Sequence, residues 1–544
     1  MKFHRFSKLL SPDSWKRLLR SRAERGRAAW LRPQVEALYT HMERLNSNQA
    51  GKVVITDGMW DNPNHFMRVR LFLEALHGIE DFRLLGILRK HNDGTRATLE
   101  ALGFREFVCI EEDEYAVDAF IPAARAMLAN VRSHAGLLDL ELPIGLPAYT
   151  FYDTVLKIVR HPQPPLQSPI WEKTLAETLR NLAIYNRVLD TTPVSHIVLS
   201  HPWKSEFASL VWCGLARGIS AYHLTAYCEG IRIRRFRRQE DYKTPVEYLP
   251  AAAYRALPAA DKGALHAYGA EYMRVRVSGT SSDVNARYAF RPDLRRSSAS
   301  EARVALGGKS TRPLVVVYSH VWYDFPHTFA MWNFTDFLDW MQFTLGVIRE
   351  VKHVDWVLKP HPTERWYGGF ELKSLLGELP SHIWLAPEAT DSLTTMLAAD
   401  AIVTVHGTVA LEAAAHGLPV ICGDRSYYSD WDFVHQAQSR QDYARLLQSV
   451  ADLSRPNDSQ RFDAVCCIGL ALAPTPADVG VLEVRCDSSG AVLYEDILQH
   501  LGGADTALDR ERLCIRNWLG GSAPSYSVDL KLQYFATGNA SINP

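Results

Sequence analysis

The stretch Ala401–Gly423, AIVTVHGTVALEAAAHGLPVICG, decides the fold of this chain. The apolar run Ala401–Val405 predicts a buried strand, and a turn follows directly at His406. The alanine-rich segment Val409–His416 predicts a short helix, after which Pro419–Cys422 predicts the next strand. Strands that alternate with helices in this way are typical of a parallel sheet.

The turn in this stretch is a candidate anion site. In a parallel sheet it places a helix N-terminus, with its N–H groups and positive dipole end, at the carboxyl edge of a strand. Gly407 and Thr408 form the turn, and we expect them and His406 to lie near a phosphate. Glu412 lies four residues after Thr408 on the same helix face, where a carboxylate could accept hydrogen bonds from ribose hydroxyls. An ordinary strand–turn–helix with a permissive glycine would give the same pattern.

A second loop, 45 residues upstream, strengthens the anion-site interpretation. Trp356–Thr363 reads WVLKPHPT, a strand that stops at Lys359, Pro360, His361 and Pro362. Prolines cannot continue a strand, so they fix a rigid loop at its end. An ammonium and an imidazole in that loop are suitable donors to an anionic oxygen. Two such loops at strand ends of one sheet are expected to face the same site.

The ordered pair of motifs resembles the C-terminal half of bacterial capsule and lipopolysaccharide glycosyltransferases of the GT-B fold. The resemblance is to the capsule group that includes Kdo transferases and, more distantly, to sialyltransferases with an HP motif. It covers residues 311–435 well and the N-terminal half loosely. It implies two Rossmann-like domains that face each other across a cleft, and a CMP-sugar whose phosphate is held by His361, Gly407 and Thr408. It also implies a nucleoside near Glu412.

The sequence departs from this family at His406, where many relatives carry Ser or Asn. The HP-motif sialyltransferases use an acidic-acidic-Gly element as the base. Here Glu229 and Gly230 match that element, while Cys228 replaces the first acid. The alternative for Glu229 is a loop carboxylate paired with a nearby arginine such as Arg232.

Other candidate acids lie at predicted strand ends, a position favoured for function in α/β sheets. Asp324 follows the strand Leu314–Tyr318 in a His-x-x-x-Asp context with His320, which we assign to the donor side. Asp57 and Asp61 follow the first strand of the N-terminal half, where GT-B enzymes commonly meet the acceptor.

Composition excludes several classes of protein. The net charge is −1 over 544 residues, which gives no argument for nucleic-acid binding. The 8 cysteines are scattered without CxxC spacing, as expected for reduced thiols of a cytoplasmic protein. No apolar run is long enough to cross a membrane, and the basic N-terminus lacks the apolar centre of a signal peptide.

The basic N-terminus is the exception to this balanced charge. Residues 1–32 hold ten Lys or Arg against Asp13 and Glu24, interleaved with Trp and Phe. Such a segment could lie on an anionic membrane surface as a peripheral anchor, or pack on the protein as a solvated helix.

The pattern predicts five segments along the chain. These are a basic N-terminal segment (1–50), a Rossmann-like acceptor domain (51–274), a Ser-, Arg- and Gly-rich linker (275–312), a Rossmann-like donor domain (313–460) and a C-terminal extension of unclear role (461–544).

Taken together, the sequence and the resemblance predict a metal-independent, cofactor-free glycosyltransferase of surface polysaccharide biosynthesis. The expected donor is CMP-Kdo or a related nucleotide sugar, and the expected acceptor is a glycan or a lipid-linked glycan. A polyol-phosphate transferase using CDP-glycerol and a non-catalytic capsule assembly protein remain alternatives. A nucleotide-sugar 2-epimerase shares the fold, but its acidic and histidine pattern is not evident.

Overall fold

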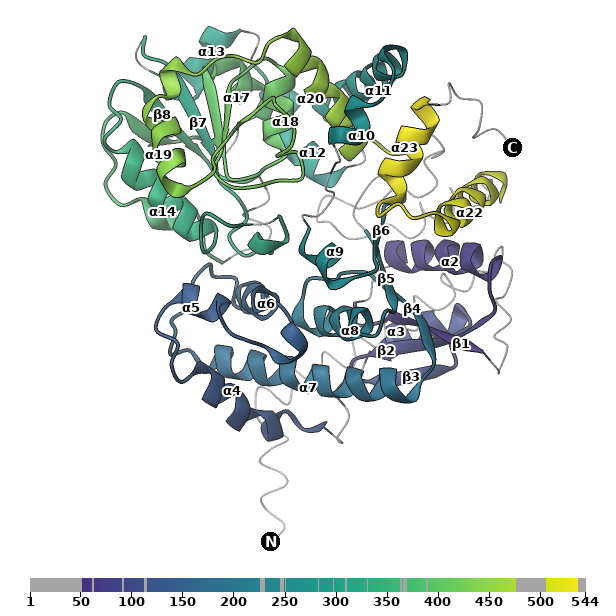
Figure 1. The fold of residues 1–544 in the computed structure, drawn as a ribbon. Helices are drawn as coiled ribbons and strands as arrows, with labels where there is room; N and C mark the ends of the chain where they lie inside the picture. The colour runs from purple at the N-terminus through teal and green to yellow at the C-terminus, as the bar shows by residue number, and fades with distance from the viewer. Residues whose placement is uncertain are drawn as a thin grey trace.

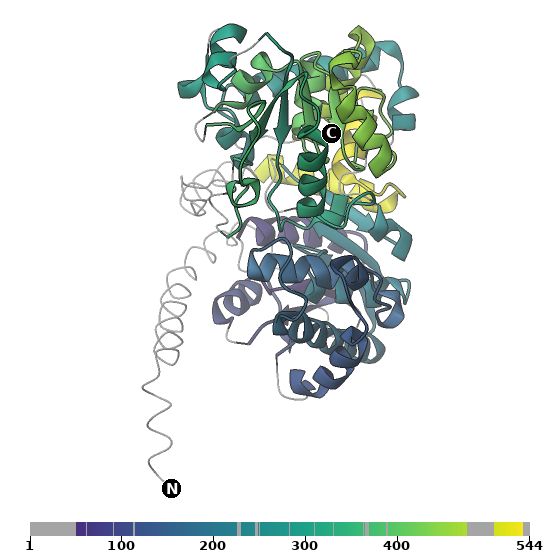
Figure 2. The ribbon, with the colours of Figure 1, turned by 90° about the vertical axis from the view of Figure 1, so that its left-hand side faces the viewer.

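The computed structural model describes most of the chain between residues 51 and 536 (Figure 1). The described residues are 51–60, 63–90, 92–111, 115–225, 230–244, 249, 251–281, 283–296, 298–308, 311–329, 331–362, 364, 369–387, 390–475 and 505–536. They form two domains, each built on a six-stranded sheet with helices on both faces (Figure 2). The basic segment of residues 1–32 lies outside the described residues, so its membrane role stays a prediction.

The first sheet has the strand order β3-β2-β1-β4-β5-β6. Its strands are β1 (Lys52–Asp57), β2 (Phe82–Leu88), β3 (Glu106–Cys109), β4 (Val194–Leu199), β5 (Ser220–Leu224) and β6 (Ile233–Phe236). The first five strands are parallel, and β6 runs antiparallel to β5. Five of the six β1 residues are buried, as expected for a central strand covered on both faces.

Helices and short 3-10 turns (η) surround this sheet. They are α2 (Pro63–His77), α3 (Asp93–Ala101), η3 (Val117–Phe120), α4 (Ile121–Leu128), α5 (His134–Leu138), η4 (Pro143–Gly145), α6 (Tyr149–Val159), α7 (Pro169–Thr191), α8 (Ser205–Leu215) and α9 (Gln239–Lys243). Every residue of α8 is buried, which fits its nearly continuous apolar sequence.

The second sheet has the order β12-β11-β10-β7-β8-β9, and all its strand pairs are parallel. Its strands are β7 (Leu314–Tyr318), β8 (Asp355–Lys359), β9 (Ile383–Leu385), β10 (Ala401–Thr404), β11 (Val420–Cys422) and β12 (His435–Gln436). Its helical elements are η6 (Pro326–Phe329), α14 (Phe337–Ile348), α16 (Lys373–Leu376), α17 (Ser392–Ala398), α18 (Val409–Ala415), α19 (Arg440–Gln448) and η7 (Val450–Asp452).

The two sheets share one topology. When the strands of the second sheet are numbered from β7 and its order is read from the β9 end, both sheets have the order 3-2-1-4-5-6. This is a doubly wound Rossmann arrangement. In each sheet the order in which the strands are added reverses between two neighbouring parallel strands. These strands are β1 and β4 in one domain and β7 and β10 in the other. Ligands of such sheets bind outside the carboxyl ends of the strands at this switch point.

The carboxyl edges of the two sheets face each other. His201, just after β4, packs its ring 4.7 Å from that of Phe325, in the loop after β7. Helix α6 strengthens this contact, because Tyr152 donates a hydrogen bond of 2.6 Å to Asp336 at the start of α14. The expected GT-B-like class, two Rossmann-like domains face to face, is therefore confirmed.

The segment 275–312, expected to connect the domains, carries helices. It contains α12 (Val284–Ala289), η5 (Pro292–Leu294) and α13 (Ala299–Ala305). The segment docks on the second domain because the N–H groups of Arg291 and Arg296 donate to side chains near the start of α17. The predicted domain boundaries themselves stay predictions.

The C-terminal extension contacts both domains. It includes most of α20 (Asp458–Ala471), together with α22 (Asp505–Gly520) and α23 (Tyr526–Ala536). Helix α22 packs on α2 of the first domain, while α23 packs on α20 and on α11 (Ala259–Val277). The short helix α10 (Ala251–Arg255) precedes α11. The buried Lys531 ammonium donates to the carbonyls of Gly469, Leu470 and Ala473, which end α20.

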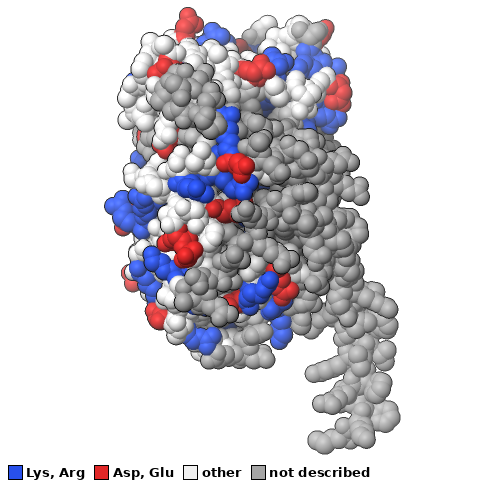
Figure 3. All heavy atoms as spheres, turned by 90° about the vertical axis from the view of Figure 1, so that its right-hand side faces the viewer, with Lys and Arg blue, Asp and Glu red and all other residues white. Residues whose placement is uncertain are grey.

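Charge is distributed without a dominant sign. In the described part of the face shown in Figure 3, Lys and Arg side chains gather near the middle and are interspersed with acidic ones. Within the described residues, no helix has the length and apolar character needed to span a bilayer.

Candidate active site

Three histidines meet at the carboxyl edge of the second sheet. His320 follows β7, His361 follows β8 and His406 follows β10. The His320 ring centroid lies 5.7 Å from that of His361 and 5.4 Å from that of His406. Phe337 stacks on His320 at 4.3 Å and fixes its ring. Because β7 lies between β8 and β10, this histidine cluster spans the switch point of the sheet.

Burial favours the uncharged form of the three histidines. Burial, together with the neighbouring His320 and Lys359, lowers the pKa of His361 to about 3, although Asp324 opposes the shift. Burial also lowers the pKa of His320 and, more strongly, that of His406. Neutral imidazoles can donate through one nitrogen and accept through the other. The cluster therefore offers polar donors without the repulsion of three cations.

The turn after β10 is held in a defined shape. Gly407 donates its N–H to Thr404 Oγ1 at 3.2 Å, and its carbonyl accepts a bond of 2.8 Å from the Tyr428 hydroxyl. A Cβ on Gly407 would lie 2.9 Å from Thr404 Oγ1, so this position favours glycine. Thr408 is half-buried and immediately precedes α18. The turn brings His406, Gly407 and Thr408 to the same edge as the other two histidines.

The charged groups of Lys359 and Glu412, two predicted donor-side residues, are paired within the protein. The Lys359 ammonium donates to the carbonyl and the hydroxyl of Thr390, both at 3.1 Å, and burial lowers its pKa to about 8. The Glu412 carboxylate accepts a hydrogen bond of 2.8 Å from Arg276 on α11. Both side chains thus stabilise neighbouring segments, and their contact with a nucleotide stays a prediction. Pro362 is half-buried in the loop after His361.

Asp57 occupies the matching switch point of the first sheet. It ends β1, is fully buried, and accepts bonds from the N–H (2.6 Å) and hydroxyl (2.8 Å) of Ser200, just after β4. Burial raises the pKa of Asp57 to about 7, although the hydrogen bonds from Ser200 oppose the shift. His65 Nε2 lies 3.7 Å from the carboxylate, and burial lowers the pKa of His65 to about 3. The pKa of this carboxyl suits a group that exchanges a proton near neutral pH.

Asp324 is paired across the domain interface. Lys157 on α6 donates a bond of 2.6 Å to its carboxylate. Burial opposes ionisation, but Lys157 outweighs it and the pKa of Asp324 is lowered. A second bridge of the same kind joins His327 Nδ1 to Asp153 at 2.7 Å. Asp324 is therefore a carboxylate that ties the two domains together beside the histidine cluster.

Two of the predicted acids, Glu229 and Asp61, lie outside the described residues. A cavity of about 170 Å³ opens at the carboxyl end of β5. His223, Thr225 and the β6 arginines line it from the first domain, and Ala471 and the start of α23 line it from the C-terminal extension. The predicted role of Glu229 as base stays a prediction.

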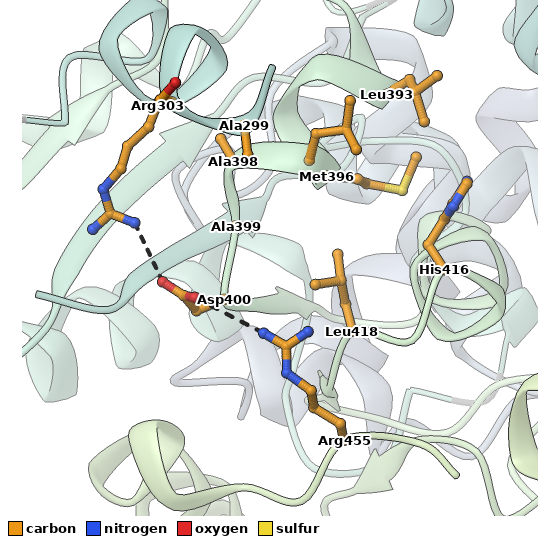
Figure 4. A pocket seen from close by; sticks show the side chains of 12 residues that line it. Ala299, Arg303, Leu393, Met396, Ala398, Ala399, Asp400, His416, Leu418 and Arg455 are labelled. Atoms are coloured by element: carbon orange, nitrogen blue, oxygen red, sulfur yellow. Dashed lines mark hydrogen bonds and ion pairs between the residues drawn. The ribbon is translucent and has the colours of Figure 1, made fainter. Parts of the chain in front are cut away.

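A larger cavity, of about 400 Å³, lies away from this edge (Figure 4). Leu393, Met396 and Leu418 form its apolar wall, and Asp400 lies between Arg303 and Arg455 at its polar rim. Asp400 precedes β10, so this cavity sits at the amino ends of the strands, opposite the histidine cluster. Among the described residues, no group of three or more His, Cys, Asp or Glu is arranged to hold a metal ion.

Sequence reasoning did not single out two residues that hold the candidate acids. Ser200 donates to Asp57, and Lys157 pairs with Asp324. Ser200 closes the apolar run that begins at Ile197, and such a strand end is a local signal that could have found it. Lys157 lies in a helix far from Asp324 in the sequence, so no local pattern could have paired them.

Comparison with known proteins finds similarity to solved structures only. No protein-family model and no curated protein match the chain. The chain is similar to the UDP-GlcNAc 2-epimerase from Neisseria meningitidis bound to UDP-GlcNAc, at 8% identity over 83% of this chain and 100% of that one, with a TM-score of 0.23.

Two transferases overlap to a similar degree. The spinosyn rhamnosyltransferase SpnG is 12% identical over 78% of this chain and 97% of its own, with a TM-score of 0.26. Thermosulfurimonas dismutans KpsC, a β-Kdo 2,4 transferase, is 12% identical over 50% of this chain and 88% of its own, with a TM-score of 0.27. At these sequence identities and TM-scores the activities of those proteins say nothing about this chain. Its two-domain class is assigned from the two sheets of its own structure.

Proposed function

We propose that this chain is a GT-B glycosyltransferase that takes a sugar from a nucleotide donor, without a metal ion, for a surface polysaccharide. The observation that supports it best is the meeting of His320, His361 and His406 across the switch point of the second sheet, opposite Asp57 at the switch point of the first. Opposed polar sites in two facing Rossmann-like domains suit transfer between a donor and an acceptor.

The roles follow from the chemistry of each group. The histidine cluster, Gly407 and Thr408 would donate hydrogen bonds to the phosphate of the leaving nucleotide, which stabilises the charge that develops there. Asp57, with its pKa near 7, would accept the proton of the acceptor hydroxyl as the general base among the described carboxylates. Asp324 would hold the domains together through Lys157 and thereby position the two sites.

The resemblance of the histidine and glycine motifs to capsule and lipopolysaccharide enzymes supports a cytidine nucleotide, in the form of CMP-Kdo or a related CMP-sugar. The acceptor would be a glycan or a lipid-linked glycan at the cytoplasmic face of a membrane. A polyol-phosphate transferase would bind CDP in the same place, and an assembly protein would bind a nucleotide without transferring anything.

Calorimetry with CMP, CDP, UDP and GDP in EDTA tests the nucleotide site. We expect cytidine nucleotides to bind, and we expect His361→Ala to weaken CMP binding by about 1.5–3 kcal/mol, the value of a hydrogen bond to a charged group. Binding that requires added Mg²⁺ or Mn²⁺ refutes metal independence. An unchanged Kd in a folded His361→Ala protein moves the phosphate elsewhere.

Transfer is tested separately with labelled CMP-Kdo and a glycan acceptor. Label in the glycan is the expected result. Transfer of labelled glycerol phosphate from CDP-glycerol to the acceptor, with release of CMP, favours the polyol-phosphate transferase. Nucleotide binding with no transfer from either donor favours the assembly protein.

A further inference from the structure

Trp332 is an exposed tryptophan on a rigid support. Its side chain is 63% exposed, the highest value for any tryptophan in the described residues. Its backbone is nonetheless fixed, because its N–H donates to both carboxylate oxygens of Asp424 at 2.9 Å. The N–H of Asn333 donates to the same carboxylate at 2.7 Å, and the Asn333 amide donates to the Gly423 carbonyl at 3.1 Å. A mobile loop does not account for the exposure of this ring.

Arg425 completes a platform with Trp332. Its guanidinium carbon lies 3.9 Å from the centre of the Trp332 ring, and its own N–H donates to Asp424 at 2.8 Å. One fully buried carboxylate therefore fixes both members of the pair. Within the described residues, the Arg425 side chain is exposed and forms no ion pair. The guanidinium lies over one face of the Trp332 ring, so the Trp332–Arg425 platform combines a largely exposed indole with a cation that has no acidic partner among the described residues.

The platform lies at the edge that holds the histidine cluster. Asp424 follows β11 and donates its N–H to the carbonyl of Val405, the residue before His406. The backbone of Arg425 also lies near the His406 ring, whose pKa it raises against the effect of burial. The loop that carries Trp332 also contacts the first domain on both sides of it, through His327 and Asp336. The platform therefore borders the place where the two domains meet.

The elements next to Trp332 and next to Glu412 pack in different apolar clusters. Trp332 precedes α14, whose buried side chains belong to the same apolar cluster as those of α19. Glu412 lies on α18, a helix that packs on α20. The Glu412 carboxylate is paired with Arg276 of α11. A nucleoside beside Glu412 would leave the platform open to another group.

We propose that the Trp332–Arg425 platform binds an acidic pyranose unit of the acceptor glycan, next to the histidine cluster. This rests on the proposed glycosyltransferase function. The C–H face of a pyranose is apolar and packs on an aromatic ring, while a carboxylate on the sugar pairs with a guanidinium at its edge. An uncharged sugar would use the ring alone, so the arginine sets the preference for an acidic unit.

The test compares an acidic with an uncharged oligosaccharide of the same length. A hyaluronan hexasaccharide alternates glucuronate with N-acetylglucosamine, whereas chitohexaose contains N-acetylglucosamine alone. Calorimetry on the full chain should show tighter binding of the hyaluronan hexasaccharide. Trp332→Ala should weaken that binding by about two- to tenfold, and Trp332→Phe should restore part of it. Arg425→Gln should reduce the preference over chitohexaose by about two- to fivefold and leave chitohexaose binding unchanged.

Matched controls remove exposed side chains elsewhere. Ile79→Ala deletes an apolar side chain that is 52% exposed, and Arg238→Gln deletes a cation that is 74% exposed. Both should bind the hexasaccharides as the parent chain does. Equal binding of the two sugars by the parent, or unchanged binding in Trp332→Ala, overturns the proposal.

Nucleotide binding separates the platform from the proposed function. CMP affinity should be unchanged in Trp332→Ala and Arg425→Gln. A loss of CMP affinity in Trp332→Ala assigns the ring to a nucleobase and overturns the acceptor role. Absence of CMP binding by the parent chain refutes the proposed donor site, whereas the sugar preference and its loss in the variants are still measured directly.

Discussion

Replacement of Asp57 by asparagine should make the protein more stable at alkaline pH. The Asp57 carboxyl is fully buried, and burial raises its pKa from 3.8 to about 7. The difference of about 3 pKa units corresponds to roughly 4 kcal/mol, an upper value for the cost of ionising this group in the folded chain. Asparagine has nearly the same shape and carries no charge at any pH.

The sign of the pH dependence follows from proton binding. Below about pH 4 the Asp57 carboxyl is protonated in both the folded and the unfolded chain, so its contribution to stability is fully present. As pH rises from about 4 to 7, the unfolded chain loses this proton while the folded chain keeps it, and stability falls. Above about pH 7 both states are ionised and the loss is complete.

Urea unfolding at pH 4, 5.5, 7 and 8 and constant ionic strength measures the effect. The difference in unfolding free energy between Asp57→Asn and the parent should grow with pH by up to about 4 kcal/mol. Hydrogen bonding survives the change, since the asparagine carbonyl can accept the Ser200 N–H that now donates to Asp57. A difference that is constant across this pH range refutes the raised pKa.

Asp324→Asn is the matched control with the opposite sign. Lys157 lowers the pKa of Asp324, so ionisation of that carboxylate stabilises the folded chain at neutral pH. The stabilisation is lost as pH falls through the folded pKa, and Asp324→Asn should therefore be less stable than the parent at pH 7 and approach it in acid. If Asp57 is also the base, the transfer rate should rise with pH through about 7 and fall about 10²–10⁴-fold in Asp57→Asn.

Three further predictions concern other parts of the chain. Gly269→Ala should destabilise the protein by about 1–3 kcal/mol, because a Cβ there would lie 2.2 Å from the Val465 carbonyl oxygen where α11 crosses α20. In the control Gly263→Ala, on the same helix, the new Cβ meets no atom within 4 Å, and the unfolding free energy in the same urea assay should rise by up to about 1 kcal/mol. Glu229→Gln should lower the transfer rate without changing CMP affinity if Glu229 is the base; a lower melting temperature with an intact rate indicates a structural ion pair instead. The full chain should co-sediment with anionic vesicles, this binding should fall steeply with salt, and deletion of residues 1–32 should abolish it. Equal binding to neutral and anionic vesicles contradicts an electrostatic anchor.

Local sequence was sufficient for the central strands and for the loops that follow them. Leu314–Tyr318 was predicted with the bounds that the structure gives to β7. Apolar runs bounded by Gly, Pro or polar residues carry their own start and stop signals, so the turn at His406 and the proline loop at Lys359 were visible as strand ends.

Strand β6 was missed because its sequence is rich in arginine. Ile233–Phe236 reads IRRF, which predicts a solvated charged segment. In the fold, Arg235 is buried against the Trp518 ring at 4.1 Å and donates to the carbonyls of Trp518, Leu519 and Gly521 at the end of α22. Those partners are more than 280 residues away in the sequence, so only the tertiary fold satisfies this arginine.

The sequence by itself determined which polar groups stand at strand ends, since apolar periodicity and turn residues are local properties of the chain. Only the tertiary structure decided their partners. The order of strands in the sheet brings His320 between His361 and His406. Residues remote in sequence become partners in the fold: Lys359 donates to Thr390, and Arg276 donates to Glu412. The raised pKa of Asp57 is decided in the same way, because burial in the fold, and not its neighbours in sequence, disfavours ionisation of this carboxyl.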